Sequence, residues 1–148
     1  HLEFANVVWS PRYRKDAKLI EGVLRRATKL IPGLKELSYS ERLEKMRIPS
    51  MRYRRARGDM IEVFKFCTGM YRVKEIPLQL VDVSSVTRGH PLKLKKRRWD
   101  SKLRQHYFSD RVVDTWNGLP CSVVMAPSLN AFKNRLDSLW RNRVTEHV

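Results

Sequence analysis

Residues 14–33 decide the fold, and they read RKDAKLIEGVLRRATKLIPG. The apolar residues recur at helical spacing and predict a helix from Arg14 to Ile31, which Pro32 and Gly33 end. They fill one arc of that helix: Leu19, Ile20, Val23, Leu24, Ala27, Leu30 and Ile31. We expect this arc to lie in the core, so that truncating Leu24 or Leu30 to alanine would cost about 2–5 kcal/mol each.

A stripe of cations lies on the opposite arc of the same helix and comprises Arg14, Lys18, Arg25 and Lys29. These positions are i, i+4, i+11 and i+15, so the four side chains share one face. Glu21 interrupts the stripe once. With the apolar arc in the core, we expect the stripe to face outward, where a ligand could reach it.

Local start and stop signals predict further helices. The expected first residues or caps are Ser38, which forms a capping box with Glu41, then Ser50, Ser109 and Ser128. These helices should end near Met46, Thr68, Asn117 and Trp140. Residues 1–9 resemble the end of a helix without a cap, and with no methionine at residue 1 we expect a piece of a longer polypeptide.

Outside these predicted helices, the sequence pattern indicates secondary structure less clearly. Residues 70–88 read mostly as loop, and Leu92–Lys95 alternates with period two, as a short strand does. Leu103 to Phe108 is its expected partner in an irregular hairpin. The predicted fold class is therefore mainly α, and the sequence leaves open whether a small β-hairpin around residues 92–108 is added.

Composition indicates a polyanionic partner. The 148 residues include 31 Lys and Arg against 15 Asp and Glu, which gives a formal net charge of +16. Small soluble domains usually stay within about 2–8 charges of neutrality. Hydrophobic residues make up 42% of the chain, enough for a core, but no run reaches the ~18 apolar residues of a membrane span.

Two further basic clusters accompany the helix stripe. Between Arg47 and Arg57 there are five arginines and no acid, and the candidate contacts among them are Arg52, Arg54, Arg55 and Arg57. Positive charge in the first turns of a helix opposes the macrodipole unless an anion docks there. The second run lies beside Trp99, Tyr107 and Phe108 and contains Lys93, Lys95, Lys96, Arg97, Arg98, Lys102 and Arg104.

Basic side chains neutralise phosphates, and aromatic rings stack on unpaired bases. A solvated charge run or a nuclear-localisation patch would explain one isolated cluster, whereas three clusters in one short chain favour nucleic-acid binding.

The candidates for catalytic or metal-binding residues are weak. Asp110 and Asp114 flank Arg111 without a third acid, His90 reads as a turn residue, and the Cys and His residues lack zinc-ligand spacing. We therefore predict no catalytic and no metal-binding residue. Trp9, Trp116 and Trp140 are expected in the core.

Five blocks of the chain resemble one family in their order: residues 1–11 with 25–34, 53–65, 87–96, 108–120 and 126–133. They include His1-Leu2-Glu3-Phe4-Ala5, Arg57-Gly58-Asp59-Met60-Ile61 and Trp116-Asn117-Gly118-Leu119-Pro120. This pattern is similar to the region after the palm in LINE-type (non-LTR, jockey-like) retrotransposon reverse transcriptases. Nearly the whole chain is covered. Phe4 stands where family members often have tyrosine, and the cysteine–histidine knuckle of some relatives is absent.

The resemblance implies a helical, thumb-like domain over residues 1–70 and a basic C-terminal extension over 71–148. The thumb would grip the RNA/DNA or DNA primer duplex, and the extension would help to hold the template RNA, next to the palm and fingers of the same polyprotein. The palm with its catalytic metals lies upstream, so the fragment should hold no cofactor and be inactive alone as an RNA-directed DNA polymerase. We expect no membrane partner and a nuclear and cytoplasmic location. The alternative is a freestanding basic helical adaptor that binds RNA or protein without polymerase chemistry.

Overall fold

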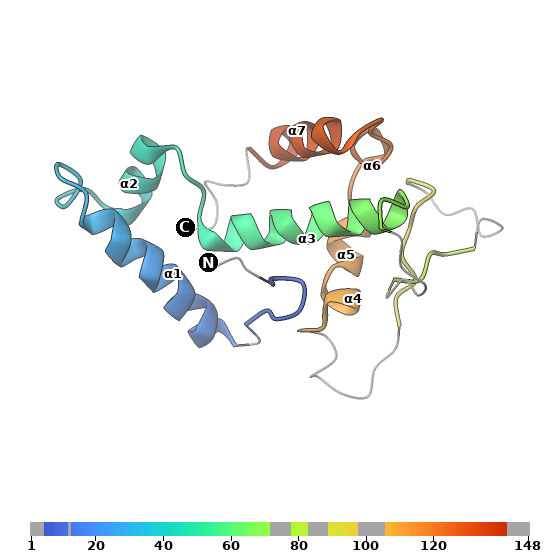
Figure 1. Cartoon of the computed structure of the whole chain (residues 1–148), viewed down its shortest axis with the longest axis horizontal. Coiled ribbons are helices and arrows are strands. Elements are labelled where there is room, and N and C mark those ends of the chain that lie inside the picture. Colours follow the sequence, from blue (N-terminus) through green and yellow to red (C-terminus); the bar gives the residue numbers. More distant parts are fainter. Residues whose placement is uncertain (1–4, 12, 72–77, 83–88, 98–105, 142–148) are drawn as a thin grey trace.

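A computed structural model describes residues 5–11, 13–71, 78–82, 89–97 and 106–141 (Figure 1). Its helices are α1 (Arg14–Lys29), α2 (Tyr39–Met46), α3 (Met51–Cys67), α4 (Phe108–Arg111), α5 (Val113–Asn117), α6 (Cys121–Val124) and α7 (Leu129–Trp140). The prediction of a mainly α fold is confirmed. Among these described residues, no helix combines the length and the apolarity that crossing a membrane requires.

The long helix α3 is the axis of the molecule (Figure 1). The helix α7 lies alongside it, α1 and α2 lie at its N-terminal end, and α4 and α5 lie across its C-terminal half. One hydrophobic cluster joins α3 to the C-terminal helices, with Val63 and Phe64 on one side and Trp116, Phe132 and Leu136 on the other. The rings of Phe64 and Phe132 stack at 4.3 Å between centroids. This cluster draws residues from both sides of position 70, where the sequence analysis puts a domain boundary.

The locally encoded helix starts occur where predicted. Ser38 and Glu41 form a reciprocal capping box at the start of α2. The hydroxyl of Ser50 accepts the N–H of Tyr53 at 3.3 Å and begins α3, and the hydroxyl of Ser128 does the same for α7. Each cap satisfies a backbone N–H that the helix itself leaves unpaired.

Three local predictions are wrong. Ser109 does not cap a helix but lies inside α4, which follows Tyr107, and Val112 separates α4 from α5. Residues 5–8 form a turn rather than the end of a helix, and Ala5 adopts a left-handed φ of 54°. Trp9 is 43% exposed instead of buried in the core. Trp116 and Trp140 are buried as predicted.

In the described part of the chain, Leu94 has a different partner from the one expected for a hairpin. Leu94 forms an isolated antiparallel bridge with Leu80, and the N–H of Lys95 donates to the carbonyl of Gln79 at 2.7 Å. The side chain of Asn117 brackets Leu94, accepting its N–H and donating to its carbonyl at 2.8 Å each. Phe108 begins α4 instead of ending a strand, and residues 103–105 lie outside the described part of the chain.

The helix α1 forms as predicted but does not bury its apolar arc. Leu30 is 83% and Leu19 is 69% exposed, and Leu24 is half-buried. The residue of α1 that is fully buried is Thr28, on the side that meets α2. Because α1 contacts α2 and α3 through this polar side, most of its apolar arc faces outward, and the expected core anchoring through Leu30 is wrong.

Candidate nucleic-acid interface

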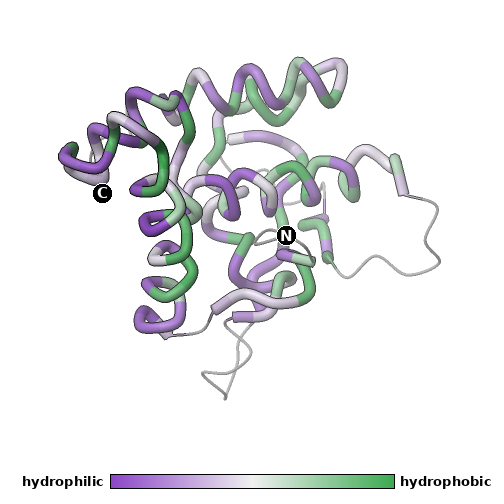
Figure 2. The backbone as a smooth tube through the Cα atoms, turned by 60° about the vertical axis from the view of Figure 1, so that its left-hand side comes forward, coloured by the Kyte–Doolittle hydropathy of each residue, from purple (hydrophilic) through white to green (hydrophobic). Residues whose placement is uncertain are grey.

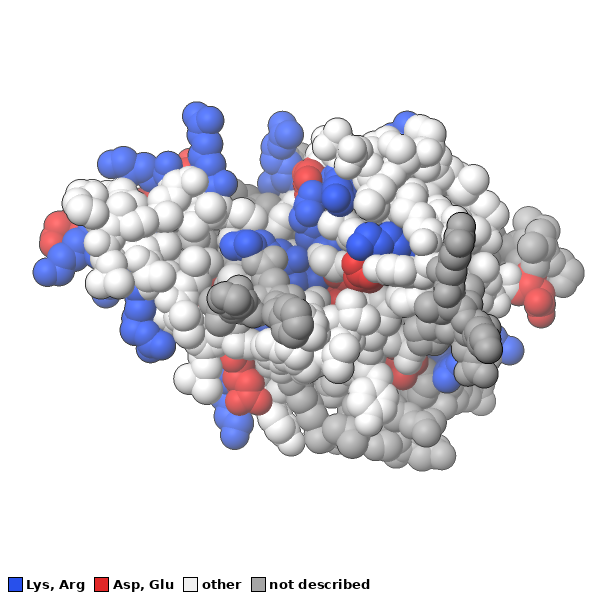
Figure 3. Space-filling model, viewed as in Figure 1, with Lys and Arg blue, Asp and Glu red and all other residues white. Residues whose placement is uncertain are grey.

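The basic stripe of α1 lies on the surface. Arg14, Lys18, Arg25 and Lys29 are all exposed. Figure 3 shows lysine and arginine side chains projecting from the left-hand part of the molecule, where Figure 1 places α1 and α2. Since the backbone of α1 fixes their spacing, the four side chains present an ordered row of charges rather than a flexible basic tail.

Glu21 does not interrupt this surface row, because its carboxylate points to the start of α3. One oxygen accepts the N–H of Met51 and the other accepts the N–H of Arg52, both at 3.3 Å. The first N–H groups of a helix lack partners within the helix and attract negative charge. Glu21 is therefore the anion that the arginine-rich start of α3 requires, and it comes from within the chain.

Tyr39 joins this junction from α2. Its hydroxyl donates to the Glu21 carboxylate. Burial, and then the hydrogen bond to Glu21, raise the pKa of Tyr39 above its ordinary value. The guanidinium of Arg25 lies 4.8 Å from the centre of the Tyr39 ring, so it is held by a cation–π contact while it stays exposed. Arg25, one of the four residues of the stripe, is thereby held against α2.

Arg42 ties the same helices together from the inside. It is 2% exposed, and its Nε donates to the hydroxyl of Thr28 at 3.0 Å. Its Nη1 donates to the carbonyl of Leu37 at 2.5 Å. This buried arginine supports the surface that carries the stripe and is not itself available to a ligand.

The arginines of α3 do not form one surface cluster. Arg52 is exposed, whereas Arg54 is half-buried and has contacts within the chain. Arg55 is also half-buried, and this burial lowers the pKa of its guanidinium. We therefore keep Arg52 as a contact candidate and give Arg54 and Arg55 a lower rank.

Arg57 is engaged in joining α3 to α7. Its Nε and Nη2 donate to the two oxygens of Asp137 at 2.6 and 2.8 Å, and the Tyr53 hydroxyl donates to the same carboxylate at 3.0 Å. The Arg57 hydrogen bonds lower the pKa of Asp137, while burial and the bond to Asp137 raise the pKa of Tyr53 to about 12. The sequence suggested a phosphate contact for Arg57, but the structure gives its charge an internal partner 80 residues away.

The second basic run is described only in part. Lys95 and Arg97 are exposed, and Lys93 is half-buried. Lys96 is exposed, and its Nζ lies 2.8 Å from both oxygens of Asp114. The remaining candidates of this run lie outside the described residues: Arg98, Lys102 and Arg104, together with Trp99.

The two exposed clusters lie at opposite ends of α3 (Figure 1). The stripe of α1 adjoins the start of α3 through Glu21. The segment with Lys95 and Arg97 lies beyond the other end, held by the bridge between Leu80 and Leu94. The 17 residues of α3 span ~25 Å, so a ligand that touches both clusters has to be longer than that.

Several exposed cations near the stripe are not among the predicted contact residues. Lys15 and Arg26 are exposed on α1, and exposed Arg47 ends α2 in a left-handed conformation with φ of 54°. The helical wheel already carries the signal for Lys15 and Arg26, because both lie beside the stripe. No comparable sequence signal exists for the inward orientation of Glu21.

A buried polar network fixes the N-terminal segment to the core. Both oxygens of Asp59 accept hydrogen bonds from Arg111, at 2.8 and 3.0 Å, and Arg111 also donates to the carbonyl of Asn6. The side chain of Asn6 donates to Asp59 at 2.7 Å. Burial raises the pKa of Asp59, and the Arg111 bonds oppose that rise. These charges are satisfied internally and serve to hold the segment in place.

The described residues offer little for catalysis. They contain no group of three or more His, Cys, Asp or Glu side chains that could hold a metal ion. His90 is 2% exposed, and its Nε2 lies 3.1 Å from the carbonyl of Trp116, to which it donates. Burial lowers the pKa of His90. It follows Gly89, whose φ of +118° makes the turn, and it packs against the Trp116 ring.

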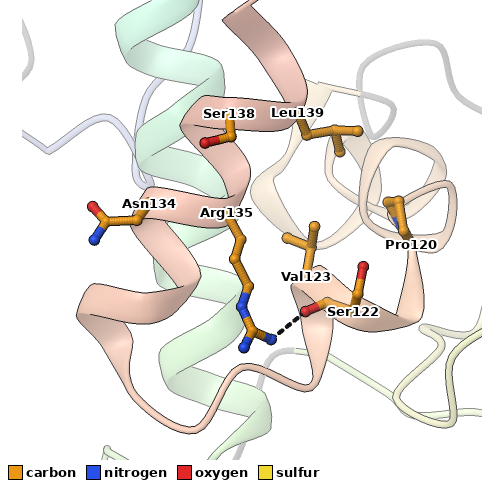
Figure 4. A pocket seen from close by; sticks show the side chains of 7 residues that line it. All are labelled: Pro120, Ser122, Val123, Asn134, Arg135, Ser138 and Leu139. Atoms are coloured by element: carbon orange, nitrogen blue, oxygen red, sulfur yellow. Dashed lines mark hydrogen bonds between the residues drawn. The ribbon is translucent and has the colours of Figure 1, made fainter.

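A hollow between α6 and α7 has a volume of about 450 Å³ (Figure 4). It is lined by Pro120, Ser122, Val123, Asn134, Arg135, Ser138 and Leu139. Arg135 donates to the carbonyl of Ser122 at 2.5 Å across its mouth. With this single cation engaged and a mostly apolar wall, the hollow does not offer the charge that phosphates require.

Comparisons with protein families, with curated proteins and with solved structures found no match for this chain.

Proposed function

We propose that this chain is the nucleic-acid-binding thumb and C-terminal portion of a non-LTR retrotransposon reverse transcriptase. In this proposal it grips the template RNA and the primer duplex, while an upstream palm supplies the metals and the polymerase chemistry. The five sequence blocks support the family, and the excess of positive charge supports a polyanionic ligand.

The observation that carries the proposal is the exposed stripe of Arg14, Lys18, Arg25 and Lys29 on α1. Along a helix axis, residues four apart are ~6 Å from each other, and the whole stripe extends over ~22 Å. Phosphates of one duplex strand recur every ~3.4 Å along the duplex axis, so the row can contact several of them. The turn of Glu21 toward α3 leaves the row without an acid among its cations.

The test is the affinity for a labelled RNA/DNA hybrid duplex, measured by fluorescence anisotropy at fixed salt. Reversing Arg14→Glu and Lys18→Glu together changes two exposed side chains near the start of α1, where acidic residues suit the helix dipole. We expect at least a tenfold loss of affinity with little change in the melting temperature. This variant leaves Arg25 and its contact with the Tyr39 ring in place.

The matched control is Lys133→Glu with Arg135→Glu, which changes the net charge equally. Both residues lie on α7, apart from α1 in Figure 1. If the control variant loses as much affinity as the stripe variant, binding reflects net charge alone and the proposed interface is wrong. Each variant is melted separately, so that a loss of folding is recognised.

A further inference from the structure

A second face of α1 is exposed and apolar. Leu19, Val23 and Leu30 are 69%, 40% and 83% exposed. At ~100° per residue, their positions fall within an arc of about 40° that runs for three turns of the helix. In Figure 2, hydrophobic and hydrophilic residues alternate along α1 with the turn of the helix. Apolar side chains aligned in this way usually mark a surface that another molecule covers.

Cations border this apolar stripe. On the helical wheel, Lys15 and Arg26 lie ~60° and ~40° to one side of the centre of the stripe, and along the helix axis Arg26 falls between Val23 and Leu30. Both cations are exposed. Of the two acids of α1, Glu21 faces α3, and Asp16 lies half-buried in the first turn, ~20° from Val23 on the other side of the stripe. A molecule that covers the stripe therefore meets apolar side chains with two exposed cations along one side.

The width of the stripe favours a helix as its occupant. Leu19, Val23 and Leu30 are separated by four and seven residues, which is the spacing of a coiled-coil seam. A seam of this kind is narrower than the apolar face with which a helix rests on a lipid surface. One further helix laid along α1 would cover all three side chains.

The cations beside the apolar stripe indicate which kind of helix would bind there. A second copy of this chain, with a formal charge of +16, would bring Lys15 and Arg26 against equally basic surfaces. A helix with carboxylates beside its seam places them opposite these cations, as charges beside a coiled-coil seam do.

We propose that Leu19, Val23 and Leu30 of α1 dock an acidic amphipathic helix of a partner protein, whose carboxylates face Lys15 and Arg26. This face lies ~130° around α1 from the row of Arg14, Lys18, Arg25 and Lys29. The two faces consist of different side chains, so the docking site does not depend on the proposed nucleic-acid function.

The probe is a labelled synthetic helix with leucine and isoleucine at the seam and glutamate beside it. Its glutamates repel one another and keep it from pairing with itself. We expect the full chain to bind this peptide at least tenfold more tightly than a scrambled peptide of the same composition. The variant with Leu19→Gln and Leu30→Gln should lose at least tenfold in affinity for the seam peptide, yet keep its melting temperature and its affinity for the hybrid duplex.

The matched control is Met125→Gln, which changes a side chain that is 52% exposed outside α1 and should bind the peptide like the unchanged chain. Equal binding of the seam and scrambled peptides, or no effect of the two glutamines, would overturn the proposal. Partition onto phosphatidylserine vesicles that requires Leu19 and Leu30, without peptide binding, would assign the face to lipid instead. A dimer in sedimentation that the two glutamines abolish, again without peptide binding, would assign it to a second copy.

Discussion

Replacing Glu21 with glutamine should weaken the junction of α1, α2 and α3. The carboxylate accepts two backbone N–H groups at the start of α3, each at 3.3 Å, as well as the Tyr39 hydroxyl. A hydrogen bond to a charged group contributes about 1.5–3 kcal/mol, and an anion at a helix N-terminus about 0.3–1 kcal/mol. Glutamine keeps one acceptor but loses the charge. Because 3.3 Å is long for such hydrogen bonds, we expect a loss near the lower end of these ranges, about 1–2 kcal/mol in the free energy of unfolding.

Urea denaturation followed by circular dichroism measures this loss directly. In thermal melts it should appear as a decrease of about 3–6 °C for a domain of this size. Glu44→Gln is the matched control, because Glu44 is exposed on α2 and its replacement should stay within about 0.5 kcal/mol. If Glu21→Gln is no more destabilising than Glu44→Gln, Glu21 does not hold the three helices together and the argument for an uninterrupted stripe fails with it.

Three further results are expected. Leu30→Ala should change stability by no more than about 0.5 kcal/mol, since Leu30 is 83% exposed, whereas buried Leu136→Ala should cost about 2–5 kcal/mol in urea denaturation. Asp137→Asn should cost about 1 kcal/mol at pH 7, because the Asp137 side chain is 38% exposed. The folded pKa of Asp137 lies below the unfolded one, so its stabilisation is complete above the unfolded value of ~4 and declines as the pH falls through the folded pKa. In parallel acid titrations, the stabilities of the unchanged chain and of Asp137→Asn should therefore converge. Lengthening a duplex from ~6 to ~20 base pairs should raise affinity more for the unchanged chain than for the variant Lys95→Ala with Arg97→Ala. The reason is that a ligand must span ~25 Å, about 8 base pairs, to reach both clusters. Equal gains in anisotropy titrations would show that the clusters act separately.

The parts of the fold that local chemistry encodes could be predicted from the sequence. Ser38, Ser50 and Ser128 begin helices because a hydroxyl next to free N–H groups is stabilising in any surroundings. Ser109 carried the same signal and was misleading, because α4 begins one residue earlier, after Tyr107. Helical periodicity also found the stripe of α1, whose candidate residues are all exposed.

The long-range partners could not be predicted. Periodicity shows which side of α1 is apolar but not whether another element covers it, and Leu30 proved to be 83% exposed. In the same way, nothing near Arg57 in the sequence indicates Asp137, 80 residues away, as the acceptor of its hydrogen bonds. Leu94 pairs with Leu80, a partner that the local pattern does not indicate, and the side chain of Asn117 at the end of α5 fixes that arrangement. These contacts depend on tertiary packing, which overrides local preference.

The most direct test of the proposed interface is the salt dependence of hybrid-duplex binding by a variant in which alanine replaces Arg14, Lys18, Arg25 and Lys29. Each phosphate contact releases counterions and contributes about 0.9 to the slope of log affinity against log salt on B-form duplex. If all four side chains contact phosphates, the variant should show a slope flatter by about 3–4 than that of the unchanged chain. An unchanged slope in a folded variant would contradict the account, because the exposed row on α1 would then make no contact with the nucleic acid.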